Sequence, residues 1–201
     1  MLEHIPAWLG RALSGRRAGD DKLVCAMAGM AGDAPLVLTS PAFADGARLP
    51  DRFTEDGAGT SPPLTWSGAP EGATLVLIVE DPDAPTPAPL VHAIVWGLAA
   101  PAGSLVEDAL VPGQAGGEVG KNSGFKQGWM PPDPPTGHGE HRYVFQLFAL
   151  APGAPDPGEA PGRRAVTDAM EGRVIASSVL IGTYSRGETA DVGPVGAAAP
   201  A

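Results

Sequence analysis

The groups in this sequence best suited to acid–base or anion-binding chemistry are a few aspartate and histidine residues that interrupt apolar segments. The first cluster is Asp81-Pro82-Asp83-Ala84-Pro85, which directly follows an apolar run ending at Glu80. Proline fixes its own φ and biases the preceding residue toward extended conformations. Both carboxylates are therefore expected on a stiff turn at a strand end, where they either serve a site or only accept backbone N–H groups.

The second candidate is His92, inside the apolar run 90–98. Strand alternation predicts that it shares a face with Leu90, Ile94 and Trp96. A histidine among such neighbours is either a core residue with a hydrogen-bond partner or a ligand-binding group, because an unpaired buried imidazole costs free energy. We predict that Asp81 supplies the partner.

The third cluster, His141-Arg142-Tyr143, follows the proline-rich segment 129–139, which is typical of a pocket rim. The guanidinium of Arg142 offers planar, bidentate donors that suit a carboxylate or a phosphate. Alternatively, Arg142 pairs internally with Asp81 or Asp83 as a structural clamp, which would leave the histidines facing the ligand.

Composition narrows the possible classes of protein. The chain has 201 residues, a formal net charge of −10, 43% hydrophobic residues and one cysteine, Cys25. The acidic balance disfavours nucleic acids and anionic membranes as nonspecific partners. No apolar run reaches the ~18–20 residues that span a bilayer. A single cysteine forms no internal disulfide and fits a reducing compartment, so we predict a cytoplasmic protein, with the periplasm as the alternative.

Several familiar catalytic motifs are missing from the sequence. No serine has glycine at both −2 and +2, no GxGxxG opens a helix after a strand, and neither CxxC nor HExxH occurs. The segment 116–121 (GGEVGK) looks like a phosphate loop, but Ala115 and Asn122 break the pattern. His138 and His141 could meet at a metal, yet they match no known ligand spacing, so we predict neither a metal nor a cofactor.

The distribution of apolar residues predicts a mostly β protein. Gly- and Pro-rich segments separate five expected strands at 36–40, 73–79, 90–98, 143–150 and 178–184. One interior helix is expected at 163–171, after Pro161 and Gly162. Apolar spacing over residues 1–17 predicts an amphipathic helix that packs on its own domain or on a second subunit.

Taken together, the string Thr60–Trp66 (TSPPLTW), the DPDAP turn, His92 and the string Gly139–Tyr143 (GEHRY) resemble the phosphatidylethanolamine-binding protein family, in particular its bacterial, Raf-kinase-inhibitor-like branch. The resemblance covers roughly 36–186. It implies an antiparallel Greek-key sheet fold with one or two peripheral helices and a small anion pocket at one end. Both ends lie outside the resemblance, so we expect an N-terminal extension with the amphipathic helix (1–34), a family domain (35–186) and, from its terminal position, a disordered tail (187–201).

The resemblance also implies roles for particular residues. By position, the expected ligand-binding residues are Asp81, His92, His141 and Tyr143, with Pro131 and Pro132 as the lip, and the expected bracing residues are Asp83 and Arg142. Two departures from the bacterial branch could reshape the pocket. Val91 and Ala93 flank His92 where that branch commonly has aromatic residues, and Met130 replaces a cysteine often found in the lip.

The function expected from the residues and the resemblance is binding of a small anionic ligand, a phosphate-type group or a phospholipid head group, without assured turnover. Two imidazoles and lip N–H groups would hold the anion against the net negative charge, and affinity should rise as pH falls through ~6–7. A hydrolase or lyase using the same Asp/His pocket is an alternative, although Ser61 and Ser123 belong to no activated-serine motif. A protein-interaction regulator, or a homodimer, is a further alternative that rests on the N-terminal helix.

Overall fold

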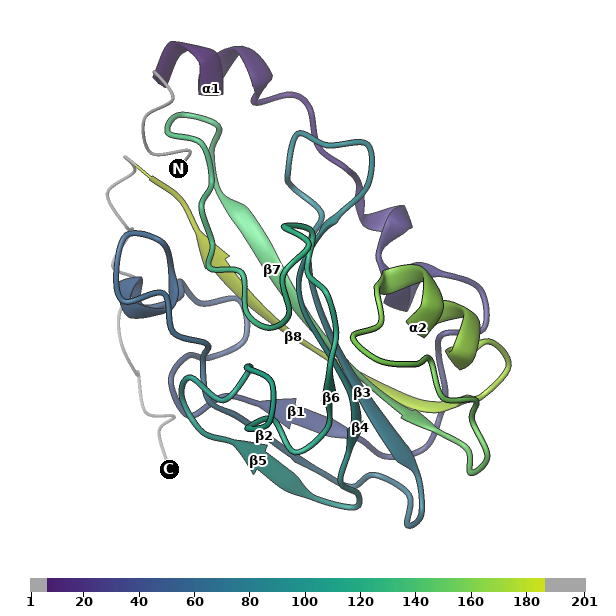
Figure 1. Ribbon diagram of the computed structural model, residues 1–201. Helices are drawn as coiled ribbons and strands as arrows, with labels where there is room; N and C mark the ends of the chain where they lie inside the picture. The colour runs from purple at the N-terminus through teal and green to yellow at the C-terminus, as the bar shows by residue number, and fades with distance from the viewer. Residues whose placement is uncertain (1–6, 187–201) are drawn as a thin grey trace, which may run out of the picture.

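Two antiparallel β-sheets pack against each other in the computed structural model, which describes residues 7–186 (Figure 1). The smaller sheet has the strand order β1-β2-β5 and the larger one the order β6-β4-β3-β7-β8. The strands are β1 Val37–Thr39, β2 Leu64–Ser67, β3 Thr74–Asp81, β4 Leu90–Leu98, β5 Gly103–Leu105, β6 Glu118–Val119, β7 His141–Leu150 and β8 Val174–Tyr184. The mostly β fold class predicted from the sequence is confirmed.

The larger sheet is buried on both faces, which explains why its central strands are almost continuously apolar. One hydrophobic cluster lies between the sheets and includes Leu77 of β3 and Trp66 of β2. The other cluster lies on the opposite face, where Val166 and Met170 of helix α2 (Arg163–Met170) pack against Ile78. In Figure 1, α2 lies beside this face of the sheet.

Element boundaries differ from the sequence predictions mainly at the ends that carry the site. β3 continues to Asp81 and β7 begins at His141, so both polar clusters belong to strand ends. The short strands β2, β5 and β6 were not predicted, because two to four residues carry too little alternation to reveal a strand.

The N-terminal part of the described chain contains a short helix, α1 (Ala7–Leu13), followed by the 3-10 turns η2 (Asp20–Lys22) and η3 (Val24–Ala26). The predicted helix over 1–17 therefore ends earlier, just before Ser14 and Gly15, two residues that favour turns. Its first six residues and the predicted disordered tail 187–201 lie outside the described residues. Within 7–186, no helix is long and apolar enough to span a bilayer.

The segment after α1 runs along the DPDAP turn. The backbone N–H groups of Ala18 and Gly19 donate to the carbonyls of Ala84 (2.9 Å) and Pro82 (3.0 Å). α1 itself lies against the loop that leads into β7 (Figure 1), so closely that a Cβ on Gly10 would meet the carbonyl oxygen of Thr136 at 2.1 Å. Only glycine permits this approach. The N-terminal segment therefore covers the same end of the sheet at which the polar clusters meet.

Candidate functional site

Antiparallel pairing of β3 with β7 brings the end of one polar strand beside the start of the other. Glu80 pairs with Val144, which places the following Asp81 beside the first residues of β7. One carboxylate oxygen of Asp81 accepts the N–H groups of Asp83 (2.8 Å) and Ala84 (3.1 Å) and so stabilises the turn. The other oxygen lies 2.8 Å from Nδ1 of His141, and both side chains are buried. Asp81 thus both shapes the turn and orients a histidine.

A cavity of about 550 Å³ opens at this end of the larger sheet. It brings together most of the residues singled out in the sequence. Among its lining residues are Asp81, His92, His141, Tyr143 and Pro131, together with Lys126, Trp129, Met130 and Pro134. Pro132 does not line it; that residue is buried, and its carbonyl accepts the N–H of Glu55.

A β-bulge turns His92 toward this cavity. Val79 pairs with Ala93 and the next residue, Glu80, pairs with Val91, so His92 is the extra residue of β4. The predicted face is therefore wrong for Ile94 and Trp96, which pack in the helix-side cluster, but Leu90 lines the cavity together with His92. The His92 ring meets Tyr143 edge-on, with ring centroids 5.0 Å apart. Bulges commonly re-aim one side chain in this way.

The two nitrogens of His92 have different surroundings. Nδ1 donates to the carbonyl of Met130 at 2.5 Å, because a carbonyl can only accept. Nε2 is buried and has no hydrogen-bond partner among the residues that the structure describes. Burial lowers the pKa of His92 from 6.5, which favours a neutral ring with a lone pair on Nε2. The prediction that Asp81 is the partner of His92 is wrong, since Met130 takes that place.

His141 uses both of its ring nitrogens within the protein. Nδ1 contacts Asp81, and Nε2 lies 2.7 Å from Nδ1 of His138, whose own Nε2 donates to the carbonyls of Leu13 (2.9 Å) and Arg16 (3.2 Å). His92 therefore holds the one imidazole nitrogen of the cavity wall without a partner in the described chain. Sequence reasoning singled out His138 only as a metal candidate, and its three-residue spacing from His141 was the available signal.

Asp83 and Arg142 form a clamp behind the cavity. The guanidinium of Arg142 contacts both carboxylate oxygens of Asp83 at 2.8 Å, and the Arg142 N–H donates to Oδ2. Arg17 adds a further ion pair at 2.6 Å. Burial alone would raise the pKa of Asp83, but these hydrogen bonds outweigh it and lower the pKa from 3.8 to about 2. The guanidinium of Arg142 donates to Asp83 and to Asp20, so it serves as a structural clamp rather than as a ligand-binding group.

The loop 121–127 forms part of the cavity mouth and is held by Asn122. The side-chain oxygen of Asn122 accepts the N–H groups of Gly124 (2.9 Å) and Lys126 (3.3 Å), and its amide donates to Gly128 (3.1 Å). This arrangement forces Phe125 to a φ of 61°, although its side chain is 89% exposed. A bulky residue in the left-handed region is strained.

Replacing Phe125 with glycine should stabilise the protein by about 1 kcal/mol, because the strain of a left-handed non-glycine residue exceeds the entropic cost of glycine. The exposed ring gives up little packing. Urea unfolding measures the change. Phe125→Ala is the matched control, since it removes the ring but keeps a Cβ, and it should gain nothing; equal gains in both variants would refute the strain argument.

No group of three or more His, Cys, Asp or Glu side chains within residues 7–186 is arranged to hold a metal ion. His138 and His141 contact each other directly through ring nitrogens rather than facing a common point.

Comparison with known proteins identifies the family. A family model described as phosphatidylethanolamine-binding protein matches residues 39–185. The chain belongs to this family. LppC of Mycobacterium tuberculosis, which its name calls a lipoprotein, is 42% identical over 150 residues, covering 75% of this chain and 72% of the relative. A UPF0098 protein of Aquifex aeolicus is 38% identical over 160 residues, covering 78% and 92%.

Two solved structures are similar to this member of the phosphatidylethanolamine-binding protein family. CT736 of Chlamydia trachomatis, described as a homologue from the same family, has a TM-score of 0.68 at 36% identity and covers 77% of this chain and 99% of its own. Escherichia coli YbcL has a TM-score of 0.68 at 29% identity, covering 76% and 99%. The resemblance inferred from the four motifs is thus confirmed, and residues 1–38 precede the family match.

Proposed function

We propose that this protein binds a small anion, a phosphate-type group either free or as part of a phospholipid head group, in the cavity beside His92. The observation that carries the proposal is that His92 lines the cavity while its buried Nε2 has no hydrogen-bond partner in the described part of the chain. An unpaired buried nitrogen costs free energy, and a ligand that supplies or accepts a hydrogen there removes this cost.

The residues around His92 favour binding of a small anion, whose charge is confined to a few atoms. The ring of Trp129 and the lip residue Pro131 give the cavity apolar walls. Lys126 adds a positive charge to a lining that also contains Glu55, Asp81 and Asp133. Charge-assisted hydrogen bonds are stronger when water is excluded. The net charge of −10 does not attract an anion from a distance, so local donors must provide the affinity.

Binding at this nitrogen should take up a proton. Burial lowers the pKa of His92 and so favours its neutral form before an anion binds. Phosphate bound as the dihydrogen ion donates to Nε2, and hydrogen phosphate bound to an imidazolium accepts from it. Either complex holds one proton more than hydrogen phosphate and neutral His92. Because bound and free states differ by this proton, affinity should increase as pH falls.

Calorimetric titration with phosphate and with phosphoethanolamine at about pH 5.5 and about pH 8, on either side of the ordinary histidine range, tests this prediction. We expect affinity roughly tenfold higher at the lower pH, equivalent to about 1.4 kcal/mol. Sulfate is the control ligand, since its charge is constant over this range; its affinity should also rise if His92 takes the proton. Affinity that is flat with pH for every ligand would contradict the proposal.

Neither serine considered for the hydrolase or lyase alternative is paired with a histidine in the part of the chain that the structure describes. The hydroxyl oxygens of Ser61 and Ser123 accept hydrogen bonds from the backbone N–H groups of Leu110 (3.1 Å) and Val91 (2.8 Å), respectively.

A cytoplasmic location remains our proposal and rests on the single cysteine, Cys25. Cell fractionation of the natural host checks it.

A further inference from the structure

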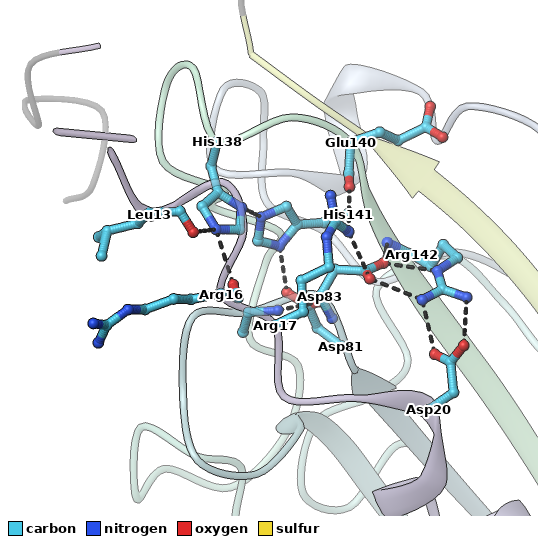
Figure 2. A network of polar contacts seen from close by, with 11 residues as sticks. Leu13, Arg16, Arg17, Asp20, Asp81, Asp83, His138, Glu140, His141 and Arg142 are labelled. Atoms are coloured by element: carbon cyan, nitrogen blue, oxygen red, sulfur yellow. Dashed lines mark hydrogen bonds and ion pairs between the residues drawn. The ribbon is translucent and has the colours of Figure 1, made fainter. Parts of the chain in front are cut away.

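A continuous chain of hydrogen bonds connects the cavity wall to the N-terminal segment. Figure 2 shows it running from Asp81 through His141 and His138 to the carbonyl oxygens of Leu13 and Arg16. The distances are 2.8 Å from Asp81 to His141, 2.7 Å between the two rings, and 2.9 and 3.2 Å to the two carbonyls. Every contact in the chain is short enough to require a proton.

The contacts of this chain fix the number of protons that it must hold. The carbonyls of Leu13 and Arg16 only accept, so Nε2 of His138 carries a hydrogen. A second proton lies between the two rings, and a third lies between His141 and Asp81. Two neutral imidazoles beside an ionised carboxylate hold only two protons, so the intact chain holds one proton more.

The extra proton belongs at the buried end of the chain. Burial, and then the neighbouring His141, lower the pKa of His138, which disfavours a cation on that ring. His141 and Asp81 are 1% and 4% exposed, and an imidazolium–carboxylate pair at 2.8 Å is favourable there. His138 is then neutral, accepting from His141 and donating to the N-terminal segment.

Loss of the extra proton removes one hydrogen bond from the chain. The proton between His141 and the carboxylate of Asp81 stays, because two acceptors at 2.8 Å would repel strongly. Two arrangements remain. Either Nε2 of His141 and Nδ1 of His138 both present lone pairs to each other, or the proton of His138 lies on Nδ1 and its Nε2 presents a lone pair to the carbonyl of Leu13. In the first case the two lone pairs repel each other and displace the ring of His138, and in the second case its hydrogen bond to Leu13 is lost. Each case loosens the hold of His138 on the N-terminal segment.

The remaining contacts decide how far such a change extends. Downstream, the N–H groups of Val24 and Cys25 donate to the buried side chains of Glu80 (3.0 Å) and Gln146 (2.7 Å), which anchor the chain. Upstream, residues 13–19 are held by His138, by the ion pair of Arg17 with Asp83, and by the two backbone bonds to the DPDAP turn. We call residues 13–19 the latch segment.

Other charged groups surround the chain of hydrogen bonds. Arg17 approaches from the latch segment and donates to the backbone carbonyl of Glu140, Asp83 approaches from the turn, and Arg142 from β7. Against the effect of burial, hydrogen bonds to Arg142 and Arg17 lower the pKa of Asp83 to about 2. Hydrogen bonds to Asp83 and Asp20 raise the pKa of Arg142, so neither of these two groups, Asp83 and Arg142, changes its charge in the histidine range. His92, on β4, is the other titratable ring facing this end of the cavity, and it does not contact the latch segment.

We propose that the latch segment is a pH-sensitive cover of the cavity wall, held in place by the extra proton on Asp81, His141 and His138 and loosened when that proton is lost. His138 acts as the positioning residue that transmits the charge of the cavity wall to the backbone at Leu13 and Arg16. The latch segment lies before the family match, which begins at residue 39. It holds whether or not the cavity binds phosphate.

Hydrogen–deuterium exchange of Ala18 and Gly19, corrected for intrinsic rates, tests the coupling in the full chain. Between about pH 5.5 and about pH 8.5 we expect protection of both amides to fall roughly tenfold, as for loss of one hydrogen bond to a charged group. In His138→Phe the protection should be low at both pH values. Lys22→Met removes only the hydrogen bond from the Lys22 ammonium to the carbonyl of Pro87 (3.0 Å). In this variant, protection should be lowered equally at both pH values and should still fall with pH.

A second measurement keeps the proposal testable if His138→Phe does not fold. Histidine side-chain ¹⁵N NMR of the wild-type protein should find three ring protons on His138 and His141 at the lower pH and two at the higher pH. Protection that is constant with pH in the wild type, or pH dependence that persists in His138→Phe, would overturn the proposal. So would a third ring proton that is retained throughout the range.

Discussion

His92→Leu is expected to weaken phosphate binding by roughly 10- to 100-fold, the effect of removing a hydrogen bond to a charged group. Leucine fills a similar volume but has no nitrogen to meet the ligand. Unfolding should remain cooperative, because the bulge that orients this side chain depends on backbone pairing between β3 and β4. Calorimetry with phosphate at about pH 5.5, where the wild-type site is expected to bind best, gives the comparison.

The matched control is Leu90→Met, which changes another lining residue of the same cavity without altering a polar group. Its affinity should stay within about twofold of the wild type, since this swap nearly conserves volume. Unchanged affinity in His92→Leu would return His92 to the core-histidine interpretation. An equal loss in both variants would show that cavity shape, rather than Nε2, determines binding.

Asp83→Asn should destabilise the fold by about 2–3 kcal/mol, which is less than a fully buried pair costs because Arg142 is partly exposed. Asp83 is buried and accepts from Arg142 and Arg17, so the variant leaves two guanidinium groups without their carboxylate. For a domain of this size the melting temperature should fall by roughly 5–10 °C. Thermal and urea unfolding measure both quantities.

Asp20→Asn provides the control on the same arginine. Asp20 contacts Arg142 at 2.7 Å but is 61% exposed, so its removal should cost less than about 1 kcal/mol. Similar losses in the two variants would mean that burial of Asp83 contributes nothing.

The pH dependence of stability follows from the lowered pKa of Asp83, about 2 against 3.8 for the free group. A lowered pKa stabilises the fold above the unfolded value and this contribution is lost as pH falls through the folded value. The wild type should therefore lose about 2 kcal/mol between about pH 4 and pH 2. Asp83→Asn should show a correspondingly shallower loss in acid; identical acid profiles would contradict this assignment.

The sequence predicted the fold class and most of the large sheet because these features depend on local patterns. The apolar run 90–98 matches β4 at both ends, and the predicted helix at 163–171 differs from α2 by one residue. Continuous apolar runs identify strands that are buried on both faces whatever their neighbours are. Short edge strands such as β5 have no such pattern, since pairing with β2 alone defines them.

The site was predicted less completely, and the differences share one cause. The sequence identified Asp81, His92 and His141 as the polar groups of one pocket, and the structure brings all three to one cavity. It did not reveal that Asp81 contacts His141 rather than His92, because that choice depends on the register of β3 against β7.

The amino-acid types and their order thus determined which chemical groups are present, which strands carry them, and the family to which the chain belongs. Only the tertiary structure decided which nitrogen of which histidine is available. A bulge between β3 and β4 turns His92 toward the cavity, and His138, brought against Leu13 by the packing of the N-terminal segment, occupies the second nitrogen of His141. The physical reason is that hydrogen-bond partners separated by 60 or 125 positions in the chain are set by strand register and packing, which no local pattern encodes.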